Sequence, residues 1–184
     1  MKFYVGIFWS LILFAFVSVG FDYPVVAEHN QNYHLFKIGR SRDANEIMYD
    51  LNLDETGVPD KSNPISIYWV KKTEDNRVKP LTWIQNRFAY GLKVLDSETS
   101  LTGDNINGSY DFQFVSYNKR NFTLKKDENN QYKVFSLIEG KEILVNRIFI
   151  QIDGGGFWRP TISSVKLYGF EVQTGIKIVE TIHP

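Results

Sequence analysis

The chain of 184 residues contains no cysteine. This excludes disulfide bonds, thiol catalysis and attachment of a lipid to a lipobox cysteine. Histidine is also scarce, and its three residues, His29, His34 and His183, are dispersed along the chain. Such spacing provides no cluster of metal ligands, so the sequence predicts neither a metal nor another cofactor.

Charge of one sign does not dominate, since 21 Lys and Arg residues balance 21 Asp and Glu residues. The basic residues are scattered and form no continuous basic stripe, which argues against nucleic acid as a partner. The sequence also has neither the Gly-x-Ser-x-Gly elbow of serine hydrolases nor a Gly-x-x-x-x-Gly-Lys phosphate loop. These absences favour a binding protein over an enzyme.

The one long apolar run lies at the N-terminus, where Phe3 to Val19 follow the single basic residue Lys2. A short basic start, an apolar stretch and small residues at its end are the three parts of a secretory signal peptide. We therefore predict cleavage after Gly20, with Ala27 as the alternative position, and export to the periplasm or the extracellular space. The competing interpretation is an uncleaved membrane anchor, because about 17 apolar residues is the lower limit for spanning a bilayer. The mature domain is predicted not to span a membrane and not to be a lipoprotein.

The rest of the chain is predicted to be one β-rich domain, residues 34–184, behind a flexible tether of residues 21–33. Short apolar runs alternate with turn-forming residues at intervals of about ten to fifteen residues, which is typical of a sandwich or barrel. We expect a single antiparallel β-sandwich or a partly closed β-barrel. The predicted strands cover residues 35–38, 46–53, 65–70, 92–95, 111–117, 122–124, 132–138, 147–152, 164–170 and 176–182.

One segment, from Trp83 to Tyr90, is predicted to be a short α-helix. Thr82 and Gln85 have the spacing of a capping box. Gly91 stands where a helix commonly ends in a left-handed conformation. The helix therefore has a start signal and a stop signal.

Four large apolar side chains, three in this helix and one in a predicted strand, are assigned to the core. Ile84 and Phe88 are four residues apart and are expected on the face that packs against the sheet. Trp69 lies in a predicted strand and Trp83 at the start of the helix, and both are expected to be buried.

Arg40 and Arg42 are the first candidate binding residues. They follow the first predicted strand, and guanidinium groups bind carboxylates or phosphates through paired N–H donors. The alternative is an ion pair within the fold, with Asp43 as one of the available partners.

The second candidate is the run Phe157, Trp158 and Arg159, which follows a predicted turn at Gly154–Gly156. Aromatic rings beside a guanidinium on a flexible loop can stack on a sugar or a peptide. The alternative is that the two aromatic residues fold back as a lid over the open end of the β core.

An enzyme remains the alternative function, and it would depend on few residues. His34 is the one plausible acid–base residue, although a histidine capping the first strand is the simpler interpretation. A carboxylate-based hydrolase or glycan-acting enzyme would use Asp50 and Asp153, with Arg40 as their electrostatic partner. Its structural criterion is a separation of the two carboxylates of about 5 to 10 Å in one cleft.

Five short blocks of residues occur in an order that is moderately specific as a combination. They are His34–Ser41, Tyr49–Asp50, Asn63–Trp69, Leu81–Ile84 and Ala89–Gly91. Together they resemble a bacterial family catalogued as domain of unknown function (DUF) 4833, whose members look like small exported domains. The resemblance implies an envelope address and supplies no activity, ligand or catalytic residue. We thus expect an envelope protein that binds a partner, a glycan or a small ligand, with the hydrolase and an anchored structural domain as alternatives.

Overall fold

The computed structural model describes residues 33–95, 109–156 and 159–184. The predicted signal peptide, nearly all of the predicted tether, and the candidate residues Phe157 and Trp158 lie outside the described residues.

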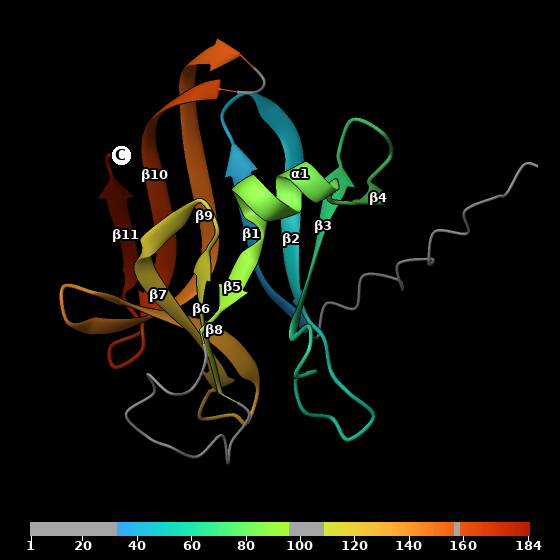
Figure 1. The fold of residues 1–184 in the computed structure, drawn as a ribbon. Helices are drawn as coiled ribbons and strands as arrows, with labels where there is room; N and C mark the ends of the chain where they lie inside the picture. Colours follow the sequence, from blue (N-terminus) through green and yellow to red (C-terminus); the bar gives the residue numbers. More distant parts are fainter. Residues whose placement is uncertain (1–32, 96–108, 157–158) are drawn as a thin grey trace, which may run out of the picture.

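The described residues form strands and one short helical segment (Figure 1), which confirms the predicted all-β fold with a single short helix. Strand β4 has no counterpart among the predicted strands. The helical segment is an α-helical turn, α1 (Trp83–Gln85), continued by a π-helical turn, η2 (Asn86–Tyr90). The strands are β1 (His34–Arg40), β2 (Asp43–Leu51), β3 (Ile65–Lys71), β4 (Arg77–Pro80), β5 (Leu92–Val94), β6 (Tyr110–Phe114), β7 (Tyr117–Lys126), β8 (Tyr132–Ile138), β9 (Lys141–Gly156), β10 (Arg159–Glu171) and β11 (Lys177–Ile182).

The long strand β9 joins the two halves of the sheet. One of its edges pairs first with β8, as in Phe135 opposite Leu144, and then with β1, as in Lys37 opposite Arg147. From β1 the sheet continues through β2 and β3 to β4, and from β8 it continues through β7 and β6 to β5. Strand β10 covers the other edge of β9 and is followed by β11. The result is a strongly curled half-barrel (Figure 1).

The pairing of β1 with β9 is parallel, whereas the other pairings among the described strands are antiparallel as predicted. A parallel pair cannot be closed by a tight hairpin and needs a long connection. Here the connection is the chain from β2 to β8, which builds most of both halves of the sheet.

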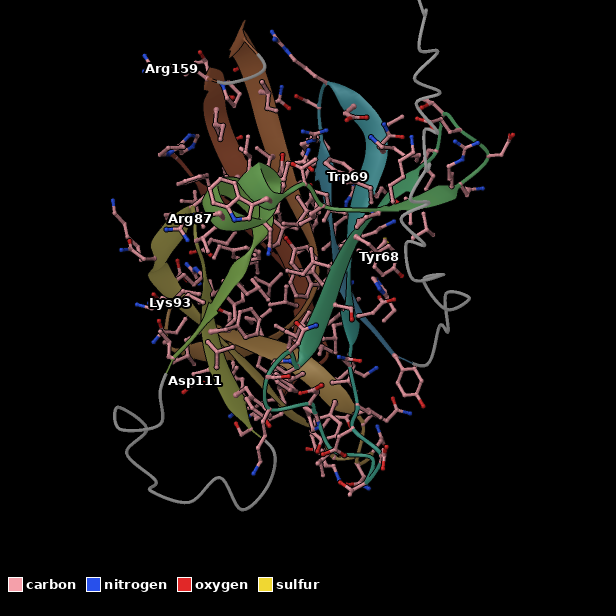
Figure 2. The ribbon with its side chains drawn as sticks, turned by 45° about the vertical axis from the view of Figure 1, so that its right-hand side comes forward. Tyr68, Trp69, Arg87, Lys93, Asp111 and Arg159 are labelled. Carbon is pink, nitrogen blue, oxygen red and sulfur yellow. The ribbon has the colours of Figure 1, made fainter. Side chains whose placement is uncertain are left out.

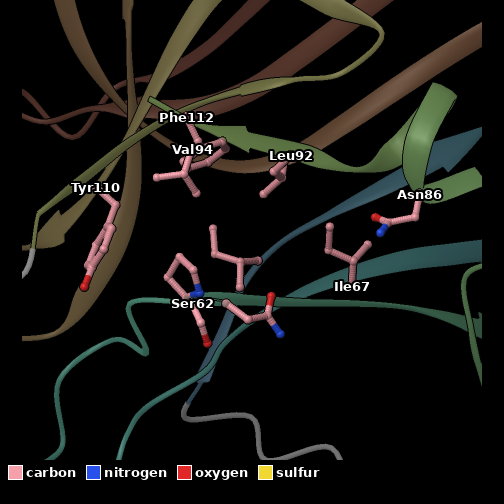
Figure 3. A pocket seen from close by; sticks show the side chains of 10 residues that line it. Ser62, Ile67, Asn86, Leu92, Val94, Tyr110 and Phe112 are labelled. Atoms are coloured by element: carbon pink, nitrogen blue, oxygen red, sulfur yellow. The ribbon is translucent and has the colours of Figure 1, made fainter. Parts of the chain in front are cut away.

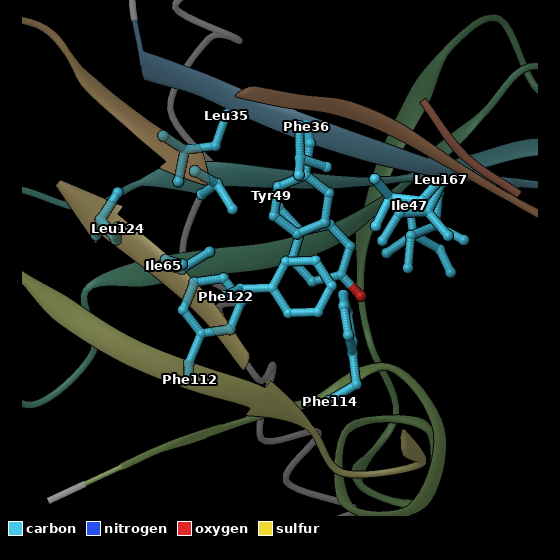
Figure 4. Packing of buried hydrophobic residues seen from close by; sticks show 14 of the residues in the cluster. Leu35, Phe36, Ile47, Tyr49, Ile65, Phe112, Phe114, Phe122, Leu124 and Leu167 are labelled. Atoms are coloured by element: carbon cyan, nitrogen blue, oxygen red, sulfur yellow. The ribbon is translucent and has the colours of Figure 1, made fainter. Parts of the chain in front are cut away.

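Aromatic rings fill the space between the two halves of the sheet (Figure 4). Phe36 of β1 stacks on Tyr49 of β2 with ring centroids 4.3 Å apart. Phe114 of β6 meets both rings edge-on, at 6.1 and 5.8 Å, and also packs on Phe122. Trp69 is 3% exposed, as predicted for a core residue. Burial of such large rings provides most of the hydrophobic free energy of a fold without disulfides.

The glycine run Gly154–Gly156 is the end of β9 and not the predicted turn. It pairs with the start of β10, Gly155 opposite Pro160 and Gly154 opposite Thr161. Gly155 has a φ of 78°, and a Cβ there would lie 2.1 Å from the carbonyl oxygen of Arg159. Glycine is therefore required at position 155 by both backbone conformation and close approach of the partner strand.

Candidate functional site

Arg40, the first predicted ligand-binding residue, is engaged inside the fold. Its Nη1 donates a hydrogen bond to the Tyr90 hydroxyl at 2.9 Å, and its Nη2 pairs with Asp43. The guanidinium lies over the ring of Trp69, 4.7 Å from the centroid. Arg40 of β1 therefore contacts β2, β3 and the helical segment. Its pairing with Asp43 corresponds to the alternative in which Arg40 forms an ion pair within the fold.

Arg42 and Arg159 lie near the same end of the sheet. Arg42 donates to the carbonyl oxygen of Asp153 at 2.7 Å, which holds the β1–β2 turn against β9. Arg159 opens β10 and is exposed (Figure 2). Phe157 and Trp158 lie outside the described residues, so the predicted binding by the run Phe157, Trp158 and Arg159 stays a prediction.

The two carboxylates of the hydrolase alternative belong to opposite ends of β1. Asp50 pairs with His34 at the start of this strand, whereas Asp153 contacts Arg42 just beyond its end. At about 3.3 Å per strand residue, this places the two carboxylates roughly 20 Å apart. The separation exceeds the range of a carboxylate pair that acts on one bond.

Asp50 instead forms a cluster with His34 and Tyr68 on three adjacent strands. The Nδ1 atom of His34 lies 2.8 Å from Asp50 Oδ1, and the Tyr68 hydroxyl donates to Asp50 Oδ2. Burial raises the pKa of Tyr68, and the hydrogen bond and charge of Asp50 raise it further. The Tyr68 hydroxyl therefore stays protonated and donates its hydrogen bond at neutral pH. The sequence indicated His34 and Asp50 as separate candidates, and the pairing of β1 with β2 brings them into contact. No group of three or more His, Asp or Glu side chains in the described ranges is arranged to hold a metal.

The most exposed aromatic side chains of the described structure lie on the helical segment, the segment that carries Arg87 in Figure 2. Trp83 is 68% exposed and Phe88 61% exposed. Their rings meet edge to face, with centroids 5.8 Å apart, and the guanidinium of Arg87 lies 5.6 Å from the centroid of Trp83 and 5.7 Å from that of Phe88. We call these three residues, Trp83, Arg87 and Phe88, the Trp83 cluster.

The core assignments of Trp83, Ile84 and Phe88 are wrong, since none of these side chains is buried. The prediction assumed a uniform α-helix, in which residues four apart share one face. The turn η2 is π-helical, with a wider repeat that rotates its residues relative to α1. The helical segment contacts the core through Gln85 and Tyr90 instead. No periodicity signal in the sequence indicates this change of helix type.

The capping box at the start of the helical segment is confirmed, and it also fixes the segment to the core. The backbone N–H of Gln85 donates to Thr82 Oγ1, and the Gln85 side chain accepts from the backbone N–H of Thr82. The same Gln85 oxygen accepts a hydrogen bond from the indole of Trp69 at 3.2 Å. The cap thus links the exposed cluster to a buried tryptophan.

The end of the helical segment is fixed by hydrogen bonds to carbonyl oxygens. The hydroxyl of the fully buried Tyr49 donates to the Tyr90 carbonyl at 2.7 Å, and Ser116 donates to the Ala89 carbonyl at 2.6 Å. Gly91 is extended, with φ of −66°, and not left-handed as predicted. It is needed because a Cβ would lie 1.9 Å from the Asn86 carbonyl oxygen.

A shallow groove runs from the helical segment between β3 and β5 (Figure 3). Asn86 lies at one end of the groove, and Ser62 and Tyr110 at the other. Its walls combine apolar and aromatic side chains with the polar residues Ser62, Asn63 and Asn86. The lining residues are Ser62, Asn63, Pro64, Ile65, Ile67, Asn86, Leu92, Val94, Tyr110 and Phe112.

Comparison with protein-family models matches residues 36–181 to the family described as Domain of unknown function (DUF4833). Neither a curated protein nor a solved structure matches the chain. In the described ranges, no helix is both long enough and apolar enough to cross a membrane.

Proposed function

The chain belongs to the DUF4833 family, and we propose that it is an exported, non-enzymatic binding domain that docks a partner protein on the Trp83 cluster. The observation that carries this proposal is the exposure of Trp83 and Phe88 on a segment that is rigidly attached to the core. By contrast, the nearby aromatic residues Trp69 and Tyr90 contact each other and pack against the hydrophobic core.

The composition of the Trp83 cluster favours a protein as the bound partner. Trp and Arg are enriched among the residues that contribute most to binding at protein interfaces. Exposed aromatic surface is unfavourable in water, so covering Trp83 and Phe88 releases free energy on docking. None of the three cluster residues lines the groove, so the cluster provides a docking surface and not an enclosing pocket for a small ligand.

The charges around the cluster favour a partner with acidic side chains. No Asp or Glu occurs from Arg77 to Leu95, a stretch that contains four basic residues. Arg77 and Lys79 pair with Glu74, whereas Arg87 has no ion-pair partner among the described residues. A carboxylate of the partner protein can bind Arg87 at the rim of the aromatic contact.

Export is the part of the proposal that rests on the N-terminal sequence. A basic residue, an apolar run and a small-residue exit support a signal peptide. The intact mass of the protein recovered from the envelope tests this, because loss of residues 1–20 or 1–27 is expected. Recovery of the full-length mass would favour the anchored alternative.

Photo-crosslinking in the source cells tests the docking surface. A photoreactive amino acid replaces Trp83 in one variant and Leu137 in another, because Leu137 is also apolar and is 65% exposed, on β8. We expect a discrete protein adduct from position 83 and none from position 137. Adding Arg87→Glu should reduce the adduct at least about fivefold, since it places a negative charge where an acidic partner binds.

Three outcomes would contradict the proposal. One is the same adducts from both positions, and another is no adduct from position 83 in cells that contain the folded protein. The third is an adduct that resists protease but is degraded by glycan-cleaving enzymes, because this would identify a glycan and not a protein as the partner.

A further inference from the structure

Strand β5 has an open edge on the side of the groove. Within the described ranges it pairs with β6 alone: the Leu95 N–H donates to the Asp111 carbonyl oxygen, and the Val115 N–H donates to the Gly91 carbonyl oxygen. Backbone N–H and C=O groups alternate between the two edges of an antiparallel strand. Leu92 and Val94 therefore direct their backbone groups away from β6, toward the groove.

Strand β3 has an open edge on the opposite wall. Strand β4 pairs with Tyr68–Lys71 and ends at Pro80, so no other described strand pairs with the N-terminal part of β3 on that side. Asn52, which follows β2, donates its N–H to the Pro64 carbonyl oxygen, so Pro64 and Ser66 direct their backbone groups toward the β2 side. Because these directions alternate along a strand, Ile65 and Ile67 direct their backbone groups to the other side, toward the groove. In the part of the chain that the structure describes, open backbone edges thus flank the groove on both sides.

The side chains between these edges are apolar. Ile65 and Ile67 line the groove from β3, and Leu92 and Val94 line it from β5. Phe112 of β6 is the strand partner of Val94 and also lines the groove (Figure 3). An apolar groove with unpaired backbone donors and acceptors at its walls matches an extended peptide, since such a peptide supplies both backbone groups and alternating side chains.

The two ends of the groove differ in charge. Arg87 follows Asn86 at the helical end. At the other end, the Tyr110 hydroxyl donates to the Pro59 carbonyl, and Asp54 and Asp60 lie close enough to act on Tyr110. Burial raises the pKa of Tyr110, and the neighbouring Tyr132 and the two carboxylates raise it further. Arg87 therefore lies next to one end of the groove, and the carboxylates of Asp54 and Asp60 lie near the other.

We propose that this groove binds an extended segment of the partner protein, which adds as a strand to the open edge of β5. The segment alternates apolar residues with polar ones, and carries an acidic residue at the Arg87 end and a basic residue at the Asp54 and Asp60 end. This inference rests on the proposed function, because the Trp83 cluster adjoins one end of the groove and would contact the same partner.

A synthetic peptide tests the inference directly. The probe has nine residues, alternating valine and threonine between an N-terminal glutamate and a C-terminal lysine, with a fluorophore for anisotropy. A matched control peptide carries N-methyl groups on alternate residues, on the backbone edge that would face β5, and a second control exchanges the two charged ends. We expect saturable binding of the probe, weakened at least about tenfold by N-methylation and about threefold by charge exchange.

Two protein variants locate the contact. Val94→Pro removes an N–H on the open edge without removing a hydrogen bond to β6, and proline is tolerated on such edges. Val94→Thr keeps the N–H and the branched shape. We expect Val94→Pro to weaken the probe at least about tenfold and Val94→Thr less than threefold, with circular dichroism confirming that both variants fold. If Val94→Pro does not fold, the N-methylated peptide still tests the backbone contact.

Three results overturn the inference: no saturable binding, equal binding of the N-methylated peptide, or a dimer of the purified chain that Val94→Pro dissociates. The last would identify a second copy as the occupant. The photo-crosslink from position 83 tests the proposed function, whereas peptide binding tests the strand addition, so failures of the two can be distinguished. An adduct without peptide binding refutes the strand addition alone, whereas peptide binding without an adduct refutes docking on the Trp83 cluster.

Discussion

Trp69 and Trp83 are the same residue type in opposite environments. Trp69 is 3% exposed and its indole N–H donates to the Gln85 side chain. The cationic groups of Arg40 and Lys71 lie 4.7 and 4.6 Å from its ring centroid. Trp83 projects into solvent. Composition and hydropathy do not distinguish two such residues, because the difference lies in their positions: Trp69 is on β3 and packs in the core, whereas Trp83 is on the helical segment.

We predict that Trp69→Ala lowers the free energy of unfolding by about 3–5 kcal/mol, because it leaves a cavity and unpaired polar groups. Trp83→Ala should change that free energy by less than about 0.5 kcal/mol. Urea denaturation of both variants, followed by far-ultraviolet circular dichroism, provides the measurement. A loss of stability from Trp83→Ala as large as that from Trp69→Ala would contradict the exposed position of the Trp83 cluster.

Glu46 provides a prediction on pH. Partial burial alone would raise its pKa, but the hydrogen bond and charge of Lys37 and the charge of Lys72 outweigh burial and lower the pKa below 4.5. A lowered folded-state pKa gives stability that is present above the unfolded-state pKa and is lost as the pH falls through the folded-state value. Glu46→Gln should therefore cost up to about 1 kcal/mol at neutral pH and almost nothing near about pH 2.5.

Urea unfolding at the two pH values measures the effect of Glu46. The matched control is Glu128→Gln, since Glu128 is exposed and forms no ion pair among the described residues. An effect of Glu46→Gln that is the same at both pH values would show that the lysine contacts do not contribute through charge.

At the scale of elements, the sequence predicts most strands because their apolar residues alternate, and alternation is a local property. It predicts the start of the helical segment for the same reason, since Thr82 and Gln85 form the cap within one turn. The exposed face of that segment could not be predicted, because it depends on the π-helical turn and on hydrogen bonds from Tyr49 and Ser116, which are distant in sequence. The Trp83 cluster was therefore assigned to the core.

Gly91 connects the helical segment to β5, and we predict that Gly91→Ala lowers the free energy of unfolding by about 1–3 kcal/mol. The added Cβ would lie 1.9 Å from the Asn86 carbonyl oxygen, so the backbone of η2 must shift. The control is Gly156→Ala, where nothing lies within 4 Å of an added Cβ, and a change below about 0.5 kcal/mol is expected. Equal unfolding midpoints of the two variants would contradict the close approach.

At the scale of the whole molecule, β9 belongs to both halves of the curled sheet. Its alternating isoleucines predict a strand, but the sequence does not indicate that one edge of this strand changes partner from β8 to β1. The change of partner decides the architecture, because it makes the two halves diverge and leaves the groove between β3 and β5. A long strand that passes through both halves also makes their stabilities interdependent.

We predict that residues 34–184 unfold as one cooperative unit, and that Val145→Ala in β9 destabilises both halves equally, by about 2 kcal/mol. Val145 is 1% exposed and lies between the part of β9 that pairs with β8 and the part that pairs with β1. Hydrogen exchange with mass spectrometry resolves peptides from β2–β3 and from β6–β7. The exchange rates of the slowest amides should rise by the same factor in both groups of peptides. The exposed substitution Leu137→Ala should leave both rates unchanged. Faster exchange in one half alone would show that the halves are separate folding units joined by β9.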